Sequence, residues 1–161
     1  MSESLLSRFE SSTETDGRKA PVPLFVDTNA LFPYFYRPSS AHDEARAVIE
    51  AIGEGDLPYN PLLTNQYVLH EVVTLLLSRE GTRATHEALE SILDEPTFQM
   101  LDVEPQLVES AVEQFRRYDD QAISLTDHVI AVQLDERGIG HLFTYDRDFR
   151  TLRVTVVPHD A

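Results

Sequence analysis

The 161-residue sequence has no cysteine, a single lysine and no long apolar run. Without cysteine the chain forms no disulfide and offers no thiolate ligand, so a metal must be held by carboxylates, histidines or backbone oxygens. Carboxylates favour hard cations such as Mg²⁺ and Mn²⁺. No apolar stretch approaches the roughly 18 residues needed to cross a bilayer, so we expect no membrane anchor.

The first 20 residues are rich in Ser, Thr and Glu and lack the apolar core of a secretion signal. We therefore expect residues 1–20 to form a mobile tail and the protein to be cytoplasmic.

The charge balance is the most unusual property of the composition. The formal net charge is −15, and Lys19 is the single lysine against twelve arginines. Such acidity disfavours nucleic-acid binding in dilute buffer, because phosphates repel it. High acidity with almost no lysine is, however, typical of proteins from a high-salt cytoplasm, such as that of a halophilic archaeon. In molar salt the Debye length falls to about 3 Å, so local charges rather than the net charge decide encounters.

Arginines gather at three places, and each cluster is either a phosphate contact or an ordinary solvated surface. The clusters are Arg79 with Arg83, Arg116 with Arg117, and Arg147 with Arg150 and Arg153. Because Arg147 and Arg150 closely follow the acidic Asp146, they are our candidates for holding substrate phosphates.

Short apolar runs alternate with longer amphipathic segments along the chain. The expected buried strands are 23–26, 57–61, 98–103, 141–144 and 154–157. The expected helices are 28–35 (a turn or two broken at Pro33), 41–52 (capped by Ser39 or Ser40), 65–79 (capped by Thr64), 82–94, 105–117 and 124–137. Strands that alternate with helices predict an α/β fold, here a three-layer α/β/α sandwich with a central, mostly parallel sheet.

Three acidic residues fall where such a sheet would bring them together. Asp27 directly follows the strand at 23–26, and Asp146 follows the strand at 141–144. In open α/β sheets, ligand sites form outside the carboxyl ends of the strands. Asp127 lies in the first turn of its helix, in line with apolar residues three, four and seven positions later, so its side chain should follow the buried face.

Glu71 is a fourth candidate because it lies inside the most apolar predicted helix, beside Val72 and Val73. Burying a lone carboxylate is costly, and glutamate is almost never buried without a partner. We therefore expect a metal ion or another cation next to Glu71.

Each acidic residue also has a purely structural interpretation. Asp27 can cap the helix after its strand, and Asp127 can complete a capping box with Ser124. The acids of the segment 146–148 can form a turn, and Glu71 can face water at a helix edge. A structural role explains any one of these acids well, but it explains poorly why all of them occur together at strand ends and helix starts.

Four motifs in order resemble those of PIN domains. They are Leu24-Phe25-Val26-Asp27-Thr28-Asn29-Ala30-Leu31, then Glu71 in mid-helix, then Ser124-Leu125-Thr126-Asp127-His128-Val129-Ile130-Ala131, and last Thr144-Tyr145-Asp146-Arg147-Asp148-Phe149. The first motif alone is weakly specific, whereas four in order are strong. The resemblance covers about residues 22–158 and implies one PIN-like domain of a parallel sheet flanked by helices.

The resemblance further implies a Mg²⁺- or Mn²⁺-dependent endoribonuclease similar to the VapC toxins of VapBC toxin–antitoxin pairs. Those toxins are typically dimers, held inactive by an antitoxin peptide. We expect Asp27 and Asp127 to be direct metal ligands, with Asp146 and Glu71 completing the site directly or through water. The metal would activate water for in-line attack on an RNA phosphodiester, and a second ion, if bound, would lie about 4 Å away.

Other residues of the motifs are candidates for supporting roles. Possible hydrogen-bonding neighbours or additional ligands are Thr28, Asn29, Ser124, Thr144 and Asp148. His128 replaces the small residue, often Ala, that commonly follows the third acid, and we expect it to alter the rim of the pocket.

Other interpretations remain open. A haloacid-dehalogenase-like phosphatase also begins with a strand ending in Asp, but it needs a second Asp where this chain has Asn29. A flap-type DNA nuclease usually needs more carboxylates and a longer chain. An inactive PIN-fold module that binds RNA or protein, or a housekeeping RNA-processing nuclease, differs from a toxin in ways that the sequence does not reveal.

Overall fold

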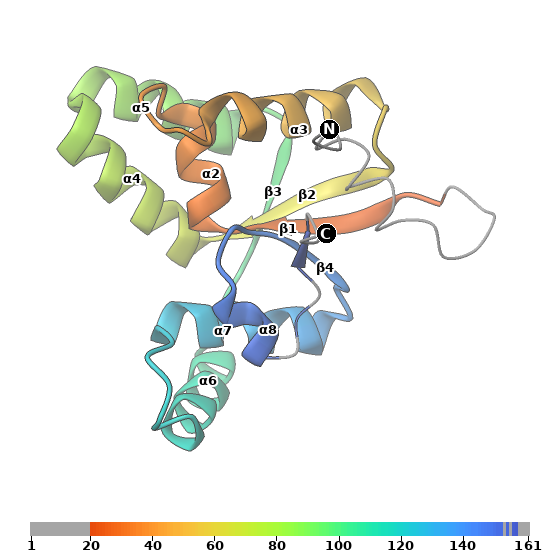
Figure 1. Cartoon of the computed structure of the whole chain (residues 1–161), viewed down its shortest axis with the longest axis vertical. Coiled ribbons are helices and arrows are strands. Elements are labelled where there is room, and N and C mark those ends of the chain that lie inside the picture. Colours follow the sequence, from red (N-terminus) through yellow and green to blue (C-terminus); the bar gives the residue numbers. More distant parts are fainter. Residues whose placement is uncertain (1–19, 153, 155, 158–161) are drawn as a thin grey trace.

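The computed structural model describes residues 20–152, 154, 156 and 157, in which helices cover both faces of a central sheet (Figure 1). The strands are β1 (Val22–Val26), β2 (Tyr59–Asn65), β3 (Phe98–Leu101), β4 (His141–Phe143) and β5 (Val156–Val157). They form one sheet in the order β3-β2-β1-β4-β5, and every neighbouring pair is parallel. The predicted α/β sandwich is confirmed. The tail predicted at 1–20 lies, apart from Ala20, outside the described residues, as does Arg153.

Two groups of helices form the outer layers (Figure 1). One face carries α2 (Thr28–Phe35), α3 (His42–Glu54), α4 (Gln66–Glu80) and α5 (Thr82–Asp94), and the other carries α6 (Pro105–Arg117), α7 (Leu125–Arg137) and the short α8 (Asp148–Thr151). The central strand β1 is covered on both sides, so Leu24, Phe25 and Val26 are all buried. No helix in the described part of the chain is long and apolar enough to cross a membrane.

The β2 strand and the start of α4 differ from the prediction. β2 extends to Asn65, whereas the sequence predicted a strand at 57–61 followed by a helix cap at Thr64. Thr64 is instead a buried strand residue, and the side chain of Asn65 caps α4 by accepting a hydrogen bond from a backbone N–H of its first turn. Pro61 hid the length of the strand, because a residue without an N–H is unusual in a central strand. The β1–β2 register shifts at this point, which accommodates the proline.

The bounds of α2, 28–35, were predicted correctly, but the break at Pro33 and the cap of α3 were not. α2 continues through Pro33, and the backbone N–H of Tyr36 still donates to the carbonyl oxygen of Phe32 at 2.9 Å beyond it. α3 begins after Ala41, which makes no side-chain capping bond, while the hydroxyl of Ser39 accepts from the N–H of Ala41 at 3.2 Å. Both errors are local and leave the strand order unchanged.

A buried amide network fastens α7 to the ends of β2 and β3. The Asn65 side-chain NH₂ donates to Gln133 Oε1 at 2.9 Å, and the Gln133 NH₂ donates to the carbonyl oxygen of Asp102 at 3.1 Å. Both amide side chains are buried. Because α7 carries Asp127 in its first turn, this network also fixes the position of the Asp127 helix relative to the sheet.

Candidate active site

Asp27 lies at the carboxyl end of β1, and its side chain is only 4% exposed. Its backbone N–H donates to the carbonyl oxygen of Phe143, which extends the β1–β4 pairing by one residue. Oδ1 accepts from the N–H of Thr28 at 2.7 Å, and Oδ2 accepts from the hydroxyl of Thr144 at 2.9 Å. The predicted capping role of Asp27 is therefore present, and it coexists with an unusually buried carboxylate.

Burial raises the pKa of Asp27 from its ordinary 3.8 to about 7. The negative charge of Asp127 raises this pKa further, hydrogen bonds from Thr144 and Thr28 lower it, and the charge of Glu71 raises it. The charged side chains that act on Asp27 are thus acidic, and they oppose its ionisation.

Asp127 lies half-buried in the first turn of α7, facing the same region. Ser124 caps this helix, since its hydroxyl accepts from the N–H of Asp127 at 3.1 Å. Burial raises the pKa of Asp127 to about 6, and the charges of Asp146, Glu71 and Asp148 raise it as well, against a lowering by Ser124. The carboxylates at the ends of β1 and β4, on α4 and on α7 therefore share one electrostatic site.

Glu71 does not have the environment that the sequence predicted. The buried residues of α4 are Val68, Val72 and Leu76, whereas Glu71 is half-buried. The helix is also apolar away from its buried stripe, as Leu77 shows with 52% exposure, and this misled the prediction. The Glu71 carboxylate accepts a hydrogen bond from the Thr28 hydroxyl at 2.6 Å, so a neutral donor satisfies part of it, and the cation expected beside Glu71 stays a prediction.

The hydroxyl of Thr144 connects the first and fourth motifs. It lies 2.9 Å from both Asp27 Oδ2 and Asn29 Oδ1, and it accepts from the N–H of Asp146 at 3.0 Å. Asn29 Oδ1 also accepts from the N–H of Tyr145 at 2.9 Å. One buried hydroxyl therefore orients residues from β1, from α2 and from the segment after β4.

Asp146, in the segment after β4, is both a turn former and a member of the acidic site, the two roles that the sequence left open for it. Asp146 Oδ1 accepts from the N–H of Asp148 at 2.9 Å, which is the hydrogen bond of a turn former, and its charge also acts on Asp127. Asp148 is exposed at the start of α8, and Arg147 and Arg150 are exposed beside it. The structure therefore brings together all four predicted acids, with Asp148 at the margin.

The four carboxylates do not form a ready-made coordination shell. In residues 20–152, 154, 156 and 157, no three Asp, Glu or His side chains are arranged to hold a metal ion. Their oxygen donors and mutual repulsion still suit a hard divalent cation, which would relieve the cost of ionising Asp27. The donor chemistry thus fits Mg²⁺ or Mn²⁺, and direct coordination requires the side chains to draw closer.

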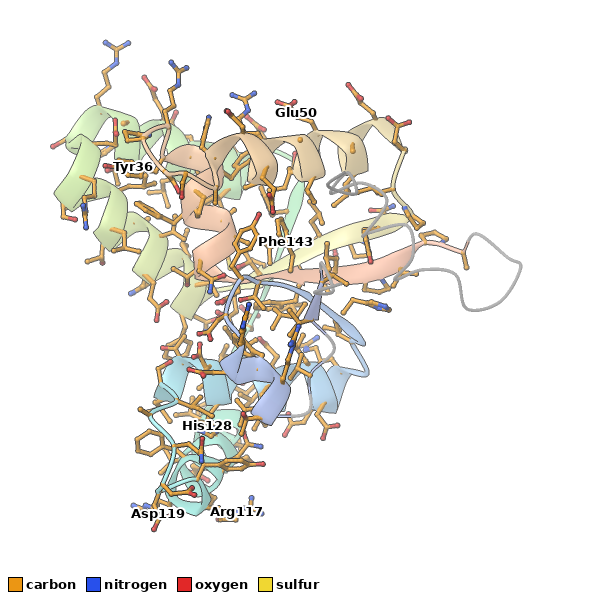
Figure 2. The ribbon with its side chains drawn as sticks, in the orientation of Figure 1. Tyr36, Glu50, Arg117, Asp119, His128 and Phe143 are labelled. Atoms are coloured by element: carbon orange, nitrogen blue, oxygen red, sulfur yellow. The ribbon has the colours of Figure 1, made fainter. Side chains whose placement is uncertain are left out.

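The structure contradicts the expectation that His128 alters the rim of the site. His128 is 0% exposed and lies on α7 where that helix faces α6 (Figure 2). Its ring packs against those of Phe115 and Tyr118, with centroids 5.6 Å apart in each case. Its Nδ1 lies 2.8 Å from Gln114 Oε1. Burial lowers the pKa of His128, which favours the neutral ring. His128 therefore belongs to the α6–α7 interface, because consecutive helix residues point about 100° apart.

The His128→Leu variant tests this placement. We expect its RNA cleavage rate, under the conditions proposed below, to stay within about threefold of wild type, because a side chain of similar size fills the same interface. Gln114 is half-exposed and can turn its amide to water. A loss of cleavage much greater than tenfold, with unchanged thermal unfolding, would show that His128 acts in the site and would contradict this placement.

Asn65 and Gln133 hold α7, the helix of Asp127, against β2, although the sequence did not single them out. The available signal was a polar amide inside an otherwise apolar segment, since Gln133 follows Ile130 on α7 by three positions. Without the fold, such an amide is indistinguishable from one that faces water.

Solved structures of toxins and toxin–antitoxin complexes have a similar fold. VapC20 of Mycobacterium tuberculosis, described as a sarcin–ricin loop cleaving toxin, is 26% identical, with a TM-score of 0.70 over 80% of this chain and 93% of its own. A toxin–antitoxin complex from Klebsiella pneumoniae is 21% identical, with a TM-score of 0.59 over 86% of this chain and 99% of that one. VapBC2 from Rickettsia felis, bound to a DNA fragment from its promoter, is 14% identical, with a TM-score of 0.64 over 84% and 97%. No curated protein sequence matches the chain.

The model of the PIN domain family matches residues 24–154, a range that contains all four acidic motif residues. The parallel strand order and the acids at the carboxyl ends of β1 and β4 agree with that match. The chain therefore belongs to the PIN domain family.

Proposed function

We propose that this protein is a metal-dependent endoribonuclease that hydrolyses RNA phosphodiester bonds as the toxin of a toxin–antitoxin pair. The observation that carries the proposal is Asp27, a carboxylate that is 4% exposed and whose pKa is raised to about 7. Keeping a buried carboxylate among other acids is unfavourable for the fold, and such groups concentrate at functional sites. Membership of the PIN family and the likeness to VapC20 favour RNA as the substrate.

In this proposal Asp27, Asp127, Asp146 and Glu71 hold Mg²⁺ or Mn²⁺. The bound ion would activate water and stabilise the negative charge that develops on the phosphate during in-line attack. The chain's own contribution is orientation, because Thr144 donates to the Asp27–Asn29 pair and anchors the backbone of Asp146.

We also assign roles in RNA and metal binding to residues at the margin of the site. Arg147 and Arg150 are exposed next to Asp146, where they would contact RNA phosphates, and Asp148 is a further candidate ligand. The Arg79–Arg83 cluster is a weaker candidate, because Arg79 lies in the last turn of α4 and Arg83 in the first turn of α5, whereas Arg147 directly follows Asp146.

We also propose a setting and partners. The net charge of −15 and the single lysine favour a high-salt cytoplasm, where the repulsion between this chain and RNA is screened. Several similar structures are toxin–antitoxin complexes, which supports an antitoxin partner here. The resemblance of the motifs to VapC toxins is our reason for proposing a homodimer as well.

The decisive assay incubates the purified protein with labelled structured RNA in molar KCl, with Mn²⁺, with Mg²⁺ or with EDTA. We expect cleavage with metal, none in EDTA, and recovery when Mn²⁺ is added in excess. Asp127→Asn should lower the cleavage rate by about 100-fold or more, a typical effect of removing one group that stabilises charge in a transition state. Asp135→Asn is the matched control, since Asp135 is exposed on the same helix.

Four outcomes would contradict the proposal or part of it. Cleavage in EDTA, or equal cleavage by wild type and Asp127→Asn, would indicate a contaminating nuclease. Tight RNA or protein binding without cleavage would favour an inactive PIN-fold module. A gene that stands alone, without a neighbouring frame for a small antitoxin, would favour a housekeeping RNA-processing enzyme.

A further inference from the structure

Thr28 donates hydrogen bonds to two of the four site carboxylates. Its backbone N–H donates to Asp27 Oδ1 at 2.7 Å, and its hydroxyl donates to Glu71 Oε2 at 2.6 Å. The second bond joins residues 43 positions apart, at the start of α2 and in the middle of α4.

The Thr28 hydroxyl is available for this contact because of its place in the fold. A threonine hydroxyl inside a helix commonly bonds the carbonyl three or four residues earlier. Thr28 is the first residue of α2, so no carbonyl of its own helix lies in that position. The branched side chain is stiff, and it therefore presents its hydroxyl in a defined direction towards α4.

The position of the Glu71 carboxylate depends on this hydrogen bond more than the position of Asp27 depends on any single hydrogen bond. Asp27 accepts from both Thr28 and Thr144, whereas among the described residues Thr28 is the single hydrogen-bond donor to the Glu71 carboxylate. Glutamate has three rotatable side-chain bonds and loses much conformational freedom when it is held in one place. A short bond from a hydroxyl to a carboxylate is of the stronger, charge-assisted kind.

We propose that Thr28 is the positioning residue for Glu71: its hydroxyl holds the Glu71 carboxylate beside Asp27 and thereby sets the affinity of the site for its divalent cation. This inference rests on the proposed function. Only one oxygen of Glu71 is engaged by the hydroxyl, which leaves the other available to a cation. Residues that orient a metal ligand in this way typically change metal affinity by about 10- to 100-fold when they are lost.

The test compares Thr28→Val, which removes the hydroxyl at nearly constant shape, with Thr28→Ser, which keeps it. Mn²⁺ binding to the intact protein is measured by calorimetry in molar KCl, alongside the cleavage rate as a function of Mn²⁺ concentration. We expect Thr28→Val to weaken Mn²⁺ binding about tenfold or more, with a smaller loss of the rate at saturating Mn²⁺. Thr28→Ser should restore binding to within about threefold. Thr82→Val is the matched control, because Thr82 is exposed at the first position of α5.

A double variant separates positioning from a general structural effect. If Thr28 acts through Glu71, then Thr28→Val should weaken Mn²⁺ binding little further in a Glu71→Gln background, because the two residues act as one unit. An equal loss in both backgrounds would overturn the inference, as would wild-type affinity in Thr28→Val. Thermal unfolding in EDTA shows whether the variants fold, and if Thr28→Val does not, loss of affinity in Thr28→Ser would also overturn it.

The outcomes also distinguish this inference from the proposed function. Wild-type protein that neither binds Mn²⁺ nor cleaves RNA contradicts both. Wild-type protein that binds and cleaves, while Thr28→Val behaves identically, contradicts only the role of Thr28.

Discussion

Asp27→Asn should abolish RNA cleavage and at the same time stabilise the metal-free protein at pH 8. The folded-state pKa of Asp27 is about 7 against 3.8 for the ordinary group, so ionising it in the folded protein costs free energy. At 1.36 kcal/mol per pKa unit, the cost is up to about 4 kcal/mol at pH 8. The amide can keep the existing contacts, because the Thr144 hydroxyl can turn its proton to Asn29 and accept from the new NH₂.

The stabilisation should depend on pH in a defined direction. The folded-state pKa is raised, so the contribution of wild-type Asp27 to stability is present below pH 3.8 and is lost as pH rises through about 7. In EDTA, we expect Asp27→Asn to unfold about 5 °C or more above wild type at pH 8, and by less than half that margin at pH 5, because only about 1.6 of the roughly 4 kcal/mol has accumulated at pH 5. Mn²⁺ should raise the unfolding temperature of wild type at pH 8 and leave the variant almost unchanged.

Asp135→Asn provides the control for this experiment, since it removes one negative charge from an exposed position on α7 and should not shift unfolding at either pH. The contrary result would be a destabilised Asp27→Asn protein at both pH 5 and pH 8. Asp27 would then serve mainly as the cap of α2, whose loss typically costs about 0.5–2 kcal/mol.

Gln133→Met should lower the free energy of unfolding by about 2–4 kcal/mol. Methionine has nearly the length of glutamine, so the change removes hydrogen bonding rather than volume. It would leave the Asn65 NH₂ and the Asp102 carbonyl without their partner, and Asn65 is buried. Denaturant unfolding in molar KCl measures the difference.

Gln106→Met is the matched control, because Gln106 is exposed on α6 and should tolerate the change within about 0.5 kcal/mol. Equal stability of Gln133→Met and Gln106→Met would mean that the amide network contributes little and that apolar packing alone holds α7 in place.

The strand and helix pattern was predictable because it depends on neighbours within a few residues. The apolar run before Asp27 predicted β1, and Ser124 predicted the start of α7, where its hydroxyl does cap the helix. The errors at β2 and α2 both involve prolines, Pro61 and Pro33, that longer-range packing accommodates. Local preferences are a weaker guide wherever packing overrides them.

The tertiary structure alone decided which neighbours the acidic residues have. The sequence by itself placed Asp27, Asp127 and Asp146 at strand ends and at a helix start, because these positions follow from local patterns. It could not reveal that Thr28 satisfies Glu71, that Thr144 reaches Asn29 across 115 positions, or that His128 turns towards α6. Such contacts depend on sheet register and helix packing, which sum many weak interactions between distant residues, whereas capping and periodicity arise within one or two turns of chain.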